Sequence, residues 1–412
     1  FFGYADFLRR VETPSKFGSW SYEVADTKLA HRPKPKFMIQ LSHYSELLST
    51  IQGTAPTFMH LVLGDREERT FRLSDYIHYY RRLRDRFDTF IAEPPKTSPE
   101  IYDHCKLCDW RDRCADEWRA TDHLNQVANI SKVQIKRLRQ GGIYTLADLA
   151  KLPTTEAVAK VLPATLARLH SQAALQMKKR ETGENQLELL ARNNNELLPA
   201  PDDGDLYFDM EGDPLYVDGL EYLFGVYFRE KDDWVFRDFW GHDRAEEKAA
   251  FSSFMDFVTA YLVKYPSAHI YHYAHYEPTA LKKLMSLHGV REVQVDDLLR
   301  NDRLVDLYQV VRHAIRVSEP GYSIKNLETF YMQKREGAVT NAGASVVYYE
   351  KWRQTQDDEL LYKIREYNKD DCISTQLLHQ WLQTLKPKAT LISKVSAPKM
   401  LVSQKSEQVI QH

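Results

Sequence analysis

Apolar and polar residues follow strand-like and helix-like periods in the C-terminal half of the chain. Strand patterns, either alternating or as short apolar runs, occur at 206–210, 222–228 and 269–273. Helical periodicity follows near 279–288, 303–316 and 357–386. This order of elements predicts an α/β domain.

Two further regions precede that domain. The first, residues 1–98, is expected to be α/β, with strands at 20–28 and 57–63 and helices at 37–49 and 74–92. The second, residues 121–197, has a helical pattern, with a glycine turn between helices at 130–140 and 147–152. The stretch from Asn193 to Gly204 predicts a linker before the C-terminal domain.

Length and composition are those of a multidomain globular protein. The chain has 412 residues, 43% of them hydrophobic and 28% charged, and at roughly 100–200 residues per domain it should form two to four domains. The net charge of -2 gives no overall positive field, so a nucleic-acid partner would have to be bound by local patches. The sequence has no run of about 18 apolar residues, which argues against a membrane partner.

The N-terminus and the cysteines indicate the kind of compartment. The chain begins at Phe1, without Met or a signal-peptide pattern, so we expect an N-terminally truncated fragment. Three of the four cysteines, Cys105, Cys108 and Cys114, fall within ten residues. Such a local group without a secretory signal is typical of metal binding in the reducing cytoplasm.

Asp209 and Glu211 form the first candidate site. They are two residues apart on a predicted strand, so their side chains share one face and are close enough to share a cation. Neighbouring carboxylates repel, and a bound Mg²⁺ or Mn²⁺ removes that cost. The alternative is a solvated strand face, which one such pair does not exclude.

Two later segments carry further candidates. Glu277 lies between the end of a predicted strand and a helix, where sites form in α/β folds. Tyr367 and Asp371 are four residues apart near the start of the last predicted helix, so they share a helix face. Asp371 would bind metal there, and Tyr367 would orient or deprotonate a water.

These segments, in this order, resemble the motifs of the DEDD 3′–5′ exonucleases, which have an RNase H-like fold. The middle motif of that superfamily combines His or Asn with an aromatic residue and an acid, here His272, Tyr276 and Glu277. The Tyr367–Asp371 pair marks the DEDDy branch. The sequence departs from the pattern at Glu277, where the family usually has Asp.

The resemblance implies a two-metal site with Mg²⁺ or Mn²⁺. One metal would polarise water and the other would stabilise the leaving oxygen. The implied metal ligands are Asp209, Glu211, Glu277 and Asp371. Asp306 and Lys325 fall where an outer carboxylate and a substrate-facing base are expected.

A second candidate site lies near the N-terminus. Asp26 and Lys28 share a strand face, and a carboxylate beside a lysine suits phosphodiester hydrolysis. Gln40 and Tyr44 lie on one helix face. An isolated Asp-x-Lys is common by chance, so the combination carries the argument.

With Asp6, these residues resemble the RecB-like nucleases of the PD-(D/E)XK class over about residues 1–118. The family order is Asp6, Asp26, Lys28, Gln40, Tyr44. The resemblance implies a restriction-endonuclease-like α/β fold, with Asp6 and Asp26 as metal ligands.

The cysteine trio belongs to the same resemblance. RecB-like nucleases use such a trio, with one cysteine upstream, to hold a [4Fe–4S] cluster. The upstream cysteine is missing here, so Zn²⁺ completed by His104 or His123 is the alternative. Cys372 is expected to be a core thiol.

The helical region resembles a helix-hairpin-helix DNA-binding module. Its glycine turn, Gly141-Gly142, could present backbone N–H groups to a phosphate. The nearby basic residues are Lys132, Lys136, Arg137, Arg139, Lys178, Lys179 and Arg180. A solvated helix face is the alternative.

The sequence therefore predicts an α/β multidomain protein. Its parts are a truncated restriction-endonuclease-like domain at 1–120, a helical module at 121–198, an RNase H-like domain at 199–388 and a tail at 389–412. The expected function is metal-dependent hydrolysis of DNA, 3′–5′ at single strands or ends. The alternatives are an RNA-processing exonuclease and a non-catalytic nucleic-acid-binding scaffold. A superfamily 1 helicase domain or subunit is an expected partner.

Overall fold

The computed structural model forms two compact units, unit 1 (Phe1–Glu100) and unit 2 (Ile101–His412). It describes residues 3–30, 32–95, 97–102, 104–105, 108–153, 156–190, 198–333 and 342–385. The predicted tail at 389–412 and the linker residues 193–197 lie outside the described residues. Of the described helices, none combines the length and the apolar character needed to cross a membrane.

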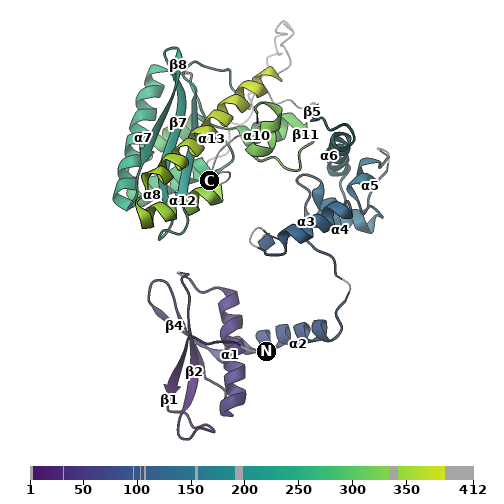
Figure 1. Ribbon diagram of the computed structural model, residues 1–412, viewed down its shortest axis with the longest axis vertical. Coiled ribbons are helices and arrows are strands. Elements are labelled where there is room, and N and C mark those ends of the chain that lie inside the picture. Colours follow the sequence, from purple (N-terminus) through teal and green to yellow (C-terminus); the bar gives the residue numbers. More distant parts are fainter. Residues whose placement is uncertain are drawn as a thin grey trace, which may run out of the picture. The chain divides into compact units, whose positions relative to one another are not determined.

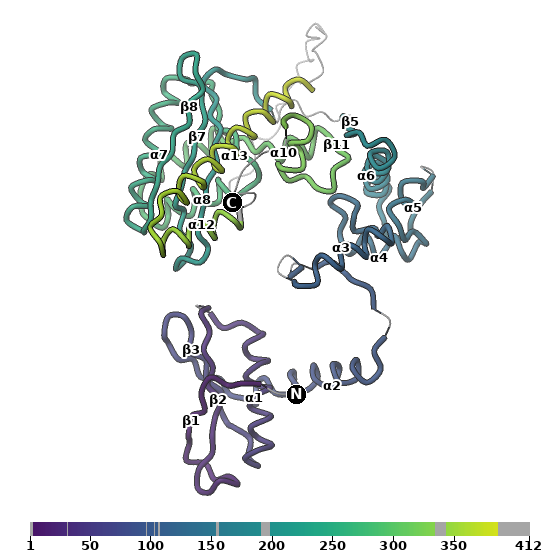
Figure 2. The backbone as a smooth tube through the Cα atoms, viewed as in Figure 1, coloured from purple at the N-terminus to yellow at the C-terminus, as the bar shows by residue number. Residues whose placement is uncertain are grey.

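Unit 1 is a four-stranded sheet with one helix packed on it (Figure 2). The strands, in sheet order, are β1 (Phe7–Val11), β2 (Ser21–Thr27), β3 (Phe58–Val62) and β4 (Glu68–Arg72). The helices are α1 (Pro35–Gln52) and α2 (Ile77–Ala92), with the short η1 (Leu73–Asp75) before α2. Only β2 and β3 are parallel, since α1 connects them as a crossover.

The packing of unit 1 follows the predicted periodicity. Val24 on β2 and Leu61 on β3 are buried against Leu41 of α1. The helix begins with Pro35 in its first turn and ends at Gly53, whose φ of 72° is the left-handed conformation that glycine adopts easily. All four elements expected for residues 1–98 are confirmed, and β1 and β4 are additions that the periodicity did not predict.

Unit 2 begins with short helices. They are α3 (Arg111–Ala120), η3 (Leu124–Gln126), α4 (Lys132–Gln140), α5 (Leu146–Ala150) and α6 (Pro163–Thr182). Capping boxes at Ser131 and Thr145 satisfy the first backbone N–H groups of α4 and α5, so the two helices begin where the sequence predicts. Gly142, between them, has a φ of 82°.

The rest of unit 2 is built on a five-stranded sheet of order β10-β9-β6-β7-β8. The strands are β6 (Leu206–Asp213), β7 (Leu220–Glu230), β8 (Asp233–Trp240), β9 (Ile270–His272) and β10 (Leu304–Asp306). The helices are α7 (Arg244–Lys264), α8 (Tyr276–His288), α9 (Glu292–Arg300), α10 (Leu307–Ala314), α11 (Ile324–Leu327), α12 (Ala342–Thr355) and α13 (Asp358–Thr384), with η5 (Glu328–Phe330). A separate pair, β5 (Leu187–Leu189) and β11 (Ile315–Val317), is antiparallel.

Apolar side chains on the two faces of this sheet form separate cores. Phe208 and Phe224 pack on one face with Phe254 of α7 and Leu281 of α8. Tyr207, on the opposite face, packs with residues of α10 and α13. Figure 1 shows α13 crossing the sheet on the side away from α7. The sheet therefore lies between two helical layers, with β6 at its centre.

Two expectations for this domain are wrong. Residues 303–316 are not one helix but β10, α10 and β11, because Leu304 to Asp306 pair with β9 and the Asp306 side chain then caps α10. The Tyr367–Asp371 segment lies in the interior of α13, not near its start, because the helix begins at Asp358 after the cap Asp357.

Candidate metal centre

The central strand β6 presents the first two carboxylates. Asp209 and Glu211 lie on the face that α13 covers, as their spacing predicts. Asp209 pairs across the sheet with Gly225 of β7. A Cβ at Gly225 would lie 1.7 Å from Oδ1 of Asn368, so only glycine lets α13 approach this closely.

Helix α13 supplies the facing side chains. Asn368 is fully buried and its Nδ2 donates to Oδ2 of Asp209 over 2.7 Å. The Cys372 thiol, the predicted core thiol, is also fully buried and donates to the Gly225 carbonyl over 3.4 Å. Burial raises the pKa of this thiol, so it stays protonated. These contacts fix the helix against β6.

Three carboxylates converge between β6 and α13. One oxygen each from Asp209, Glu211 and Asp371 lies within 4.8 Å of the others, and among the described residues this is the one such group of His, Cys, Asp or Glu ligand atoms. Hard oxygen donors at this spacing are what Mg²⁺ and Mn²⁺ bind in proteins. The residues therefore fit a divalent cation.

Glu211 is the buried member of the three, with 6% of its surface exposed. Burial, and then the negative charge of Asp371, raise its pKa to about 8, whereas hydrogen bonding to Ser345 opposes the shift. Ser345 lies on α12 and its hydroxyl is 2.7 Å from that of Tyr222. A cation at the centre would remove the electrostatic cost that burial places on the Glu211 carboxylate.

Tyr367 lies beside the three carboxylates. Its hydroxyl accepts a hydrogen bond from Nζ of Lys325 over 2.8 Å. Burial, and then the charge of Asp371, raise the pKa of Tyr367. The phenol therefore stays protonated, which favours orienting a water over deprotonating one. Lys325 is thus at the centre, as predicted.

Glu277 lies apart from the converging group. It is 3% exposed, and its Oε2 is 3.4 Å from Nδ1 of the equally buried His272. Burial raises the pKa of Glu277 and His272 opposes that shift. Asp306, the candidate outer carboxylate, instead accepts hydrogen bonds from the backbone N–H groups of Ala274 and Tyr308, so it caps α10.

Residues 206–383 match the family model of the RNase H superfamily. This part of the chain forms an RNase H-like domain. The converging carboxylates Asp209, Glu211 and Asp371 all lie within the matched residues. No curated protein matches the chain. The match supports a nuclease or related phosphodiesterase, without specifying its substrate.

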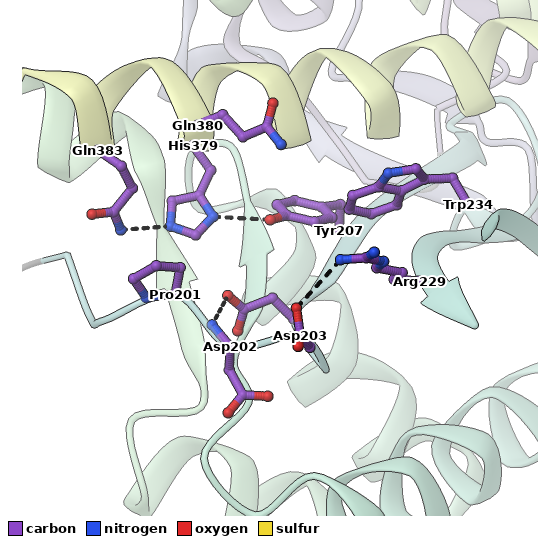
Figure 3. A pocket seen from close by; sticks show the side chains of 10 residues that line it. Pro201, Asp202, Asp203, Tyr207, Arg229, Trp234, His379, Gln380 and Gln383 are labelled. Carbon is purple, nitrogen blue, oxygen red and sulfur yellow. Dashed lines mark hydrogen bonds and ion pairs between the residues drawn. The ribbon is translucent and has the colours of Figure 1, made fainter. Parts of the chain in front are cut away.

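The RNase H-like domain also holds a cavity of 570 Å³ away from these carboxylates (Figure 3). Its lining comprises Pro201, Asp202, Asp203, Asp205, Tyr207, Arg229, Trp234, His379, Gln380 and Gln383. Figure 3 shows His379 bridging Tyr207 and Gln383, over 2.9 Å on each side. None of the predicted site residues lines this cavity, so it adds nothing to the metal centre.

Unit 1 also brings its predicted site residues together. The Asp6 carboxylate accepts hydrogen bonds from the backbone and hydroxyl of Thr27, which lower its pKa. Asp26 is 1% exposed and forms an ion pair with Lys28. Burial raises the pKa of Asp26, whereas Lys28 opposes that shift. Asp6 is therefore held by Thr27 at the end of β2, and Asp26 by the lysine two residues after it.

The predicted helix pair of unit 1 is also in contact. Nε2 of Gln40 donates to the Tyr44 hydroxyl over 3.0 Å, as their spacing on one face of α1 predicts.

The three clustered cysteines do not form a ligand group. Cys105, Cys108 and Cys114 form no disulfide and are partly exposed, and among the described residues their sulfurs do not belong to a group of ligand atoms within 4.8 Å of one another. The ring nitrogens of His123 contact Asn125 and Arg139. The [4Fe–4S] cluster and the alternative zinc site both stay predictions.

Several basic residues of the predicted helix-hairpin-helix module contact other parts of unit 2. Arg137 donates to the Lys160 carbonyl over 2.8 Å, and Arg180 pairs with Asp122. Lys179 pairs with the buried Glu319. These contacts hold the module together and attach it to the RNase H-like domain.

Three residues of the centre, Asn368, Gly225 and Ser345, were not predicted from the sequence. Asn368 lies within the Tyr367–Asp371 segment, and its contact with Asp209 depends on tertiary packing. A glycine inside a strand indicates a close backbone approach, so the close packing at Gly225 could have been predicted from the sequence. Ser345 carried no signal, since α12 reaches Glu211 only in the folded domain.

Proposed function

We propose that the RNase H-like domain is a metal-dependent nuclease that hydrolyses DNA phosphodiester bonds, acting 3′–5′ on single strands or ends. The observation that carries the proposal is the convergence of Asp209, Glu211 and Asp371 within 4.8 Å. Such an acidic group would repel a phosphodiester unless cations neutralise it, and two-metal nucleases use those cations for the reaction. The RNase H-like match agrees with this chemistry.

The chain's own residues would divide the work. Asp209, Glu211 and Asp371 would hold Mg²⁺ or Mn²⁺, which supplies a water activated at neutral pH and stabilisation of the leaving 3′ oxygen. Asn368 and Ser345 keep two of these carboxylates in place through their hydrogen bonds. Glu277, beside His272, would join as the fourth ligand of the DEDD pattern.

Tyr367 and Lys325 would act on the substrate side of the site. The protonated phenol would orient the attacking water, and the Lys325 ammonium, 2.8 Å from it, would stabilise the negative charge that develops on the phosphate. This division gives Tyr367 a positioning role and Lys325 an electrostatic one.

Unit 1 would carry a second, RecB-like nuclease site. Two contacts support this site: Asp26 pairs with Lys28, and Asp6 accepts a hydrogen bond from Thr27. Thr27 is the last residue of β2, the strand that also carries Asp26. Two carboxylates there would hold one cation, and Lys28 would contact phosphate.

The test is cleavage of end-labelled single- and double-stranded DNA and RNA with Mg²⁺, Mn²⁺ or EDTA. The wild-type chain should shorten single-stranded DNA from the 3′ end with either metal, and Asp371→Asn should not. Asp232→Asn is the matched control, because Asp232 has a fully exposed side chain in the β7–β8 turn.

Other outcomes would contradict the proposal. Faster cleavage of RNA would indicate an RNA-processing exonuclease. Strand binding without metal-dependent cleavage would indicate a non-catalytic scaffold.

A further inference from the structure

A group of arginines lies where the helical module meets the RNase H-like domain. Arg168 is on α6, Arg312 on α10 and Arg316 on β11. Figure 1 shows β5 and β11 between α6 and α10, and contacts of α6 and of α10 with β11 agree with this arrangement. Residues from both parts of unit 2 therefore meet here.

Tyr322 lies among these arginines. The Arg312 guanidinium is 5.3 Å from the centre of its ring. Its hydroxyl donates to Gln172 of α6 over 2.8 Å and accepts from the backbone N–H of Val317 over 3.3 Å. Tyr322 is 8% exposed. The junction is thus packed around Tyr322, which contacts Arg312 through its ring and α6 through its hydroxyl.

Carboxylates balance only part of this positive charge. Arg316 pairs with Glu188 over 2.5 Å. For Arg168 and Arg312, the described part of the chain provides no carboxylate within ion-pair distance. Burial, and then the charges of Arg312 and Arg316, lower the pKa of Arg168. An anion bound between them would oppose that effect.

The junction also contains space for a ligand. A cavity of 460 Å³ is lined by Arg168, Arg316 and Ser171 together with apolar residues such as Val161 and Leu166. Arginine forks match phosphate oxygens, and an apolar wall suits a base or sugar. Glu156 and Glu188 also line it, but Glu188 already pairs with Arg316.

The chain segment at this junction leads to the metal centre. The Tyr322 carbonyl accepts a hydrogen bond from Tyr273, which follows β9 directly. Lys325, three residues beyond Tyr322, contacts Tyr367 of the metal centre. The segment from Tyr322 to Lys325 thus connects the junction to the metal centre and carries a positive charge at its far end.

We propose that Arg168, Arg312 and the cavity beside them bind the sugar–phosphate backbone of a single-stranded nucleic acid whose end lies at the metal centre. The proposal rests on the proposed function for its ligand. The helical module would thereby hold the strand through α6 rather than through the glycine turn.

Binding of a 5′-labelled single-stranded oligonucleotide in EDTA, measured by fluorescence anisotropy at several salt concentrations, tests this. Arg168→Gln and Arg312→Gln should each weaken binding about tenfold and lower the salt slope by about 0.7. Arg168→Lys should keep the salt slope, because the charge remains, but lose part of the affinity. Arg300→Gln is the matched control, since Arg300 is exposed and pairs within α9.

Unchanged affinity and salt slope in both glutamine variants, with unchanged thermal melting, would overturn the proposal. A polyglutamate peptide that competes as well as unlabelled oligonucleotide would indicate an acidic protein ligand instead. Inorganic phosphate that abolishes the difference between wild type and Arg168→Gln would indicate a site for single phosphate groups. Either result would also overturn it.

The two proposals fail separately. Binding in EDTA needs no metal, so this assay measures the strand site independently of the cleavage reaction. If the arginine variants bind like wild type while cleavage depends on Asp209, the strand site is wrong and the nuclease proposal stands. If no cleavage occurs but the arginine variants still bind more weakly than wild type, the nuclease proposal is wrong and the strand site stands.

Discussion

The acidic sites of the two units differ in what surrounds their carboxylates. In unit 1, Asp26 forms an ion pair with Lys28 and Asp6 accepts two hydrogen bonds from Thr27. In the RNase H-like domain, three carboxylates face one another, and Glu211 is hydrogen-bonded to the neutral hydroxyl of Ser345. In unit 1, Lys28 offsets the charge of Asp26, whereas the buried negative charge at Glu211 favours a bound cation. We therefore expect the main metal centre between β6 and α13.

The largest expected effect is a loss of cleavage that follows substitution at the RNase H-like site but not at the site of unit 1. Asp209→Asn should lower metal-dependent cleavage about a thousandfold, because losing a metal ligand removes several kcal/mol of transition-state stabilisation. Asp26→Asn should leave 3′–5′ cleavage unchanged. Rates on 3′-labelled single-stranded DNA check this, and a larger loss in Asp26→Asn would reverse the assignment.

A smaller effect should follow from the residue that supports Glu211. Ser345→Ala removes the hydrogen bond to Glu211, and losses of this kind typically weaken metal affinity or activity about 10–100-fold. Titration of cleavage with Mn²⁺ should show the loss mainly as a higher metal requirement. Ser252→Ala, in an exposed turn of α7, is the control. Equal metal requirements in both variants would show that Ser345 has only a packing role.

The affinity of the RNase H-like site for metal should depend on pH. Burial raises the pKa of Glu211 to about 8, and a metal needs its ionised form. Metal binding at pH 7 should therefore release a proton, and affinity should fall by up to about tenfold per pH unit as pH falls from 8 to 6.

Calorimetry in two buffers of different ionisation enthalpy measures that proton release. In the metal-free chain, the stability of the folded state changes with pH in the opposite direction to metal affinity. The folded state holds the Glu211 proton more tightly than the unfolded state, so stability should fall as pH rises from about 5 to 8. Metal binding without proton release at pH 7 would contradict the raised pKa.

The smallest expected effect concerns the helix pair of unit 1. Tyr44→Phe removes the hydroxyl that accepts from Gln40, and a hydrogen bond of this kind contributes about 1 kcal/mol to stability. The melting temperature should fall by a few degrees, and the rate of 3′–5′ cleavage should not change. A loss of cleavage without a change in melting would give unit 1 a direct part in that activity.

Local pattern in the sequence was enough for much of the fold and part of the site. Alternation predicted β2, β3, β6, β7 and β9, and spacing alone put Asp209 with Glu211 and Gln40 with Tyr44 on common faces. It failed at 303–316, because two three-residue strands flank a short helix there and strands of that length exist only through their partners.

The sequence by itself determined which residue types recur at fixed spacing, and hence that carboxylates would lie on one strand face and one helix face. Only the tertiary structure decided that these faces meet. Gly225 permits the approach of α13, Asn368 and Ser345 hold the carboxylates, and burial sets the charge on Glu211. The reason is physical: spacing along an element is fixed by backbone geometry, whereas distances between elements and the loss of solvent around a charge depend on packing.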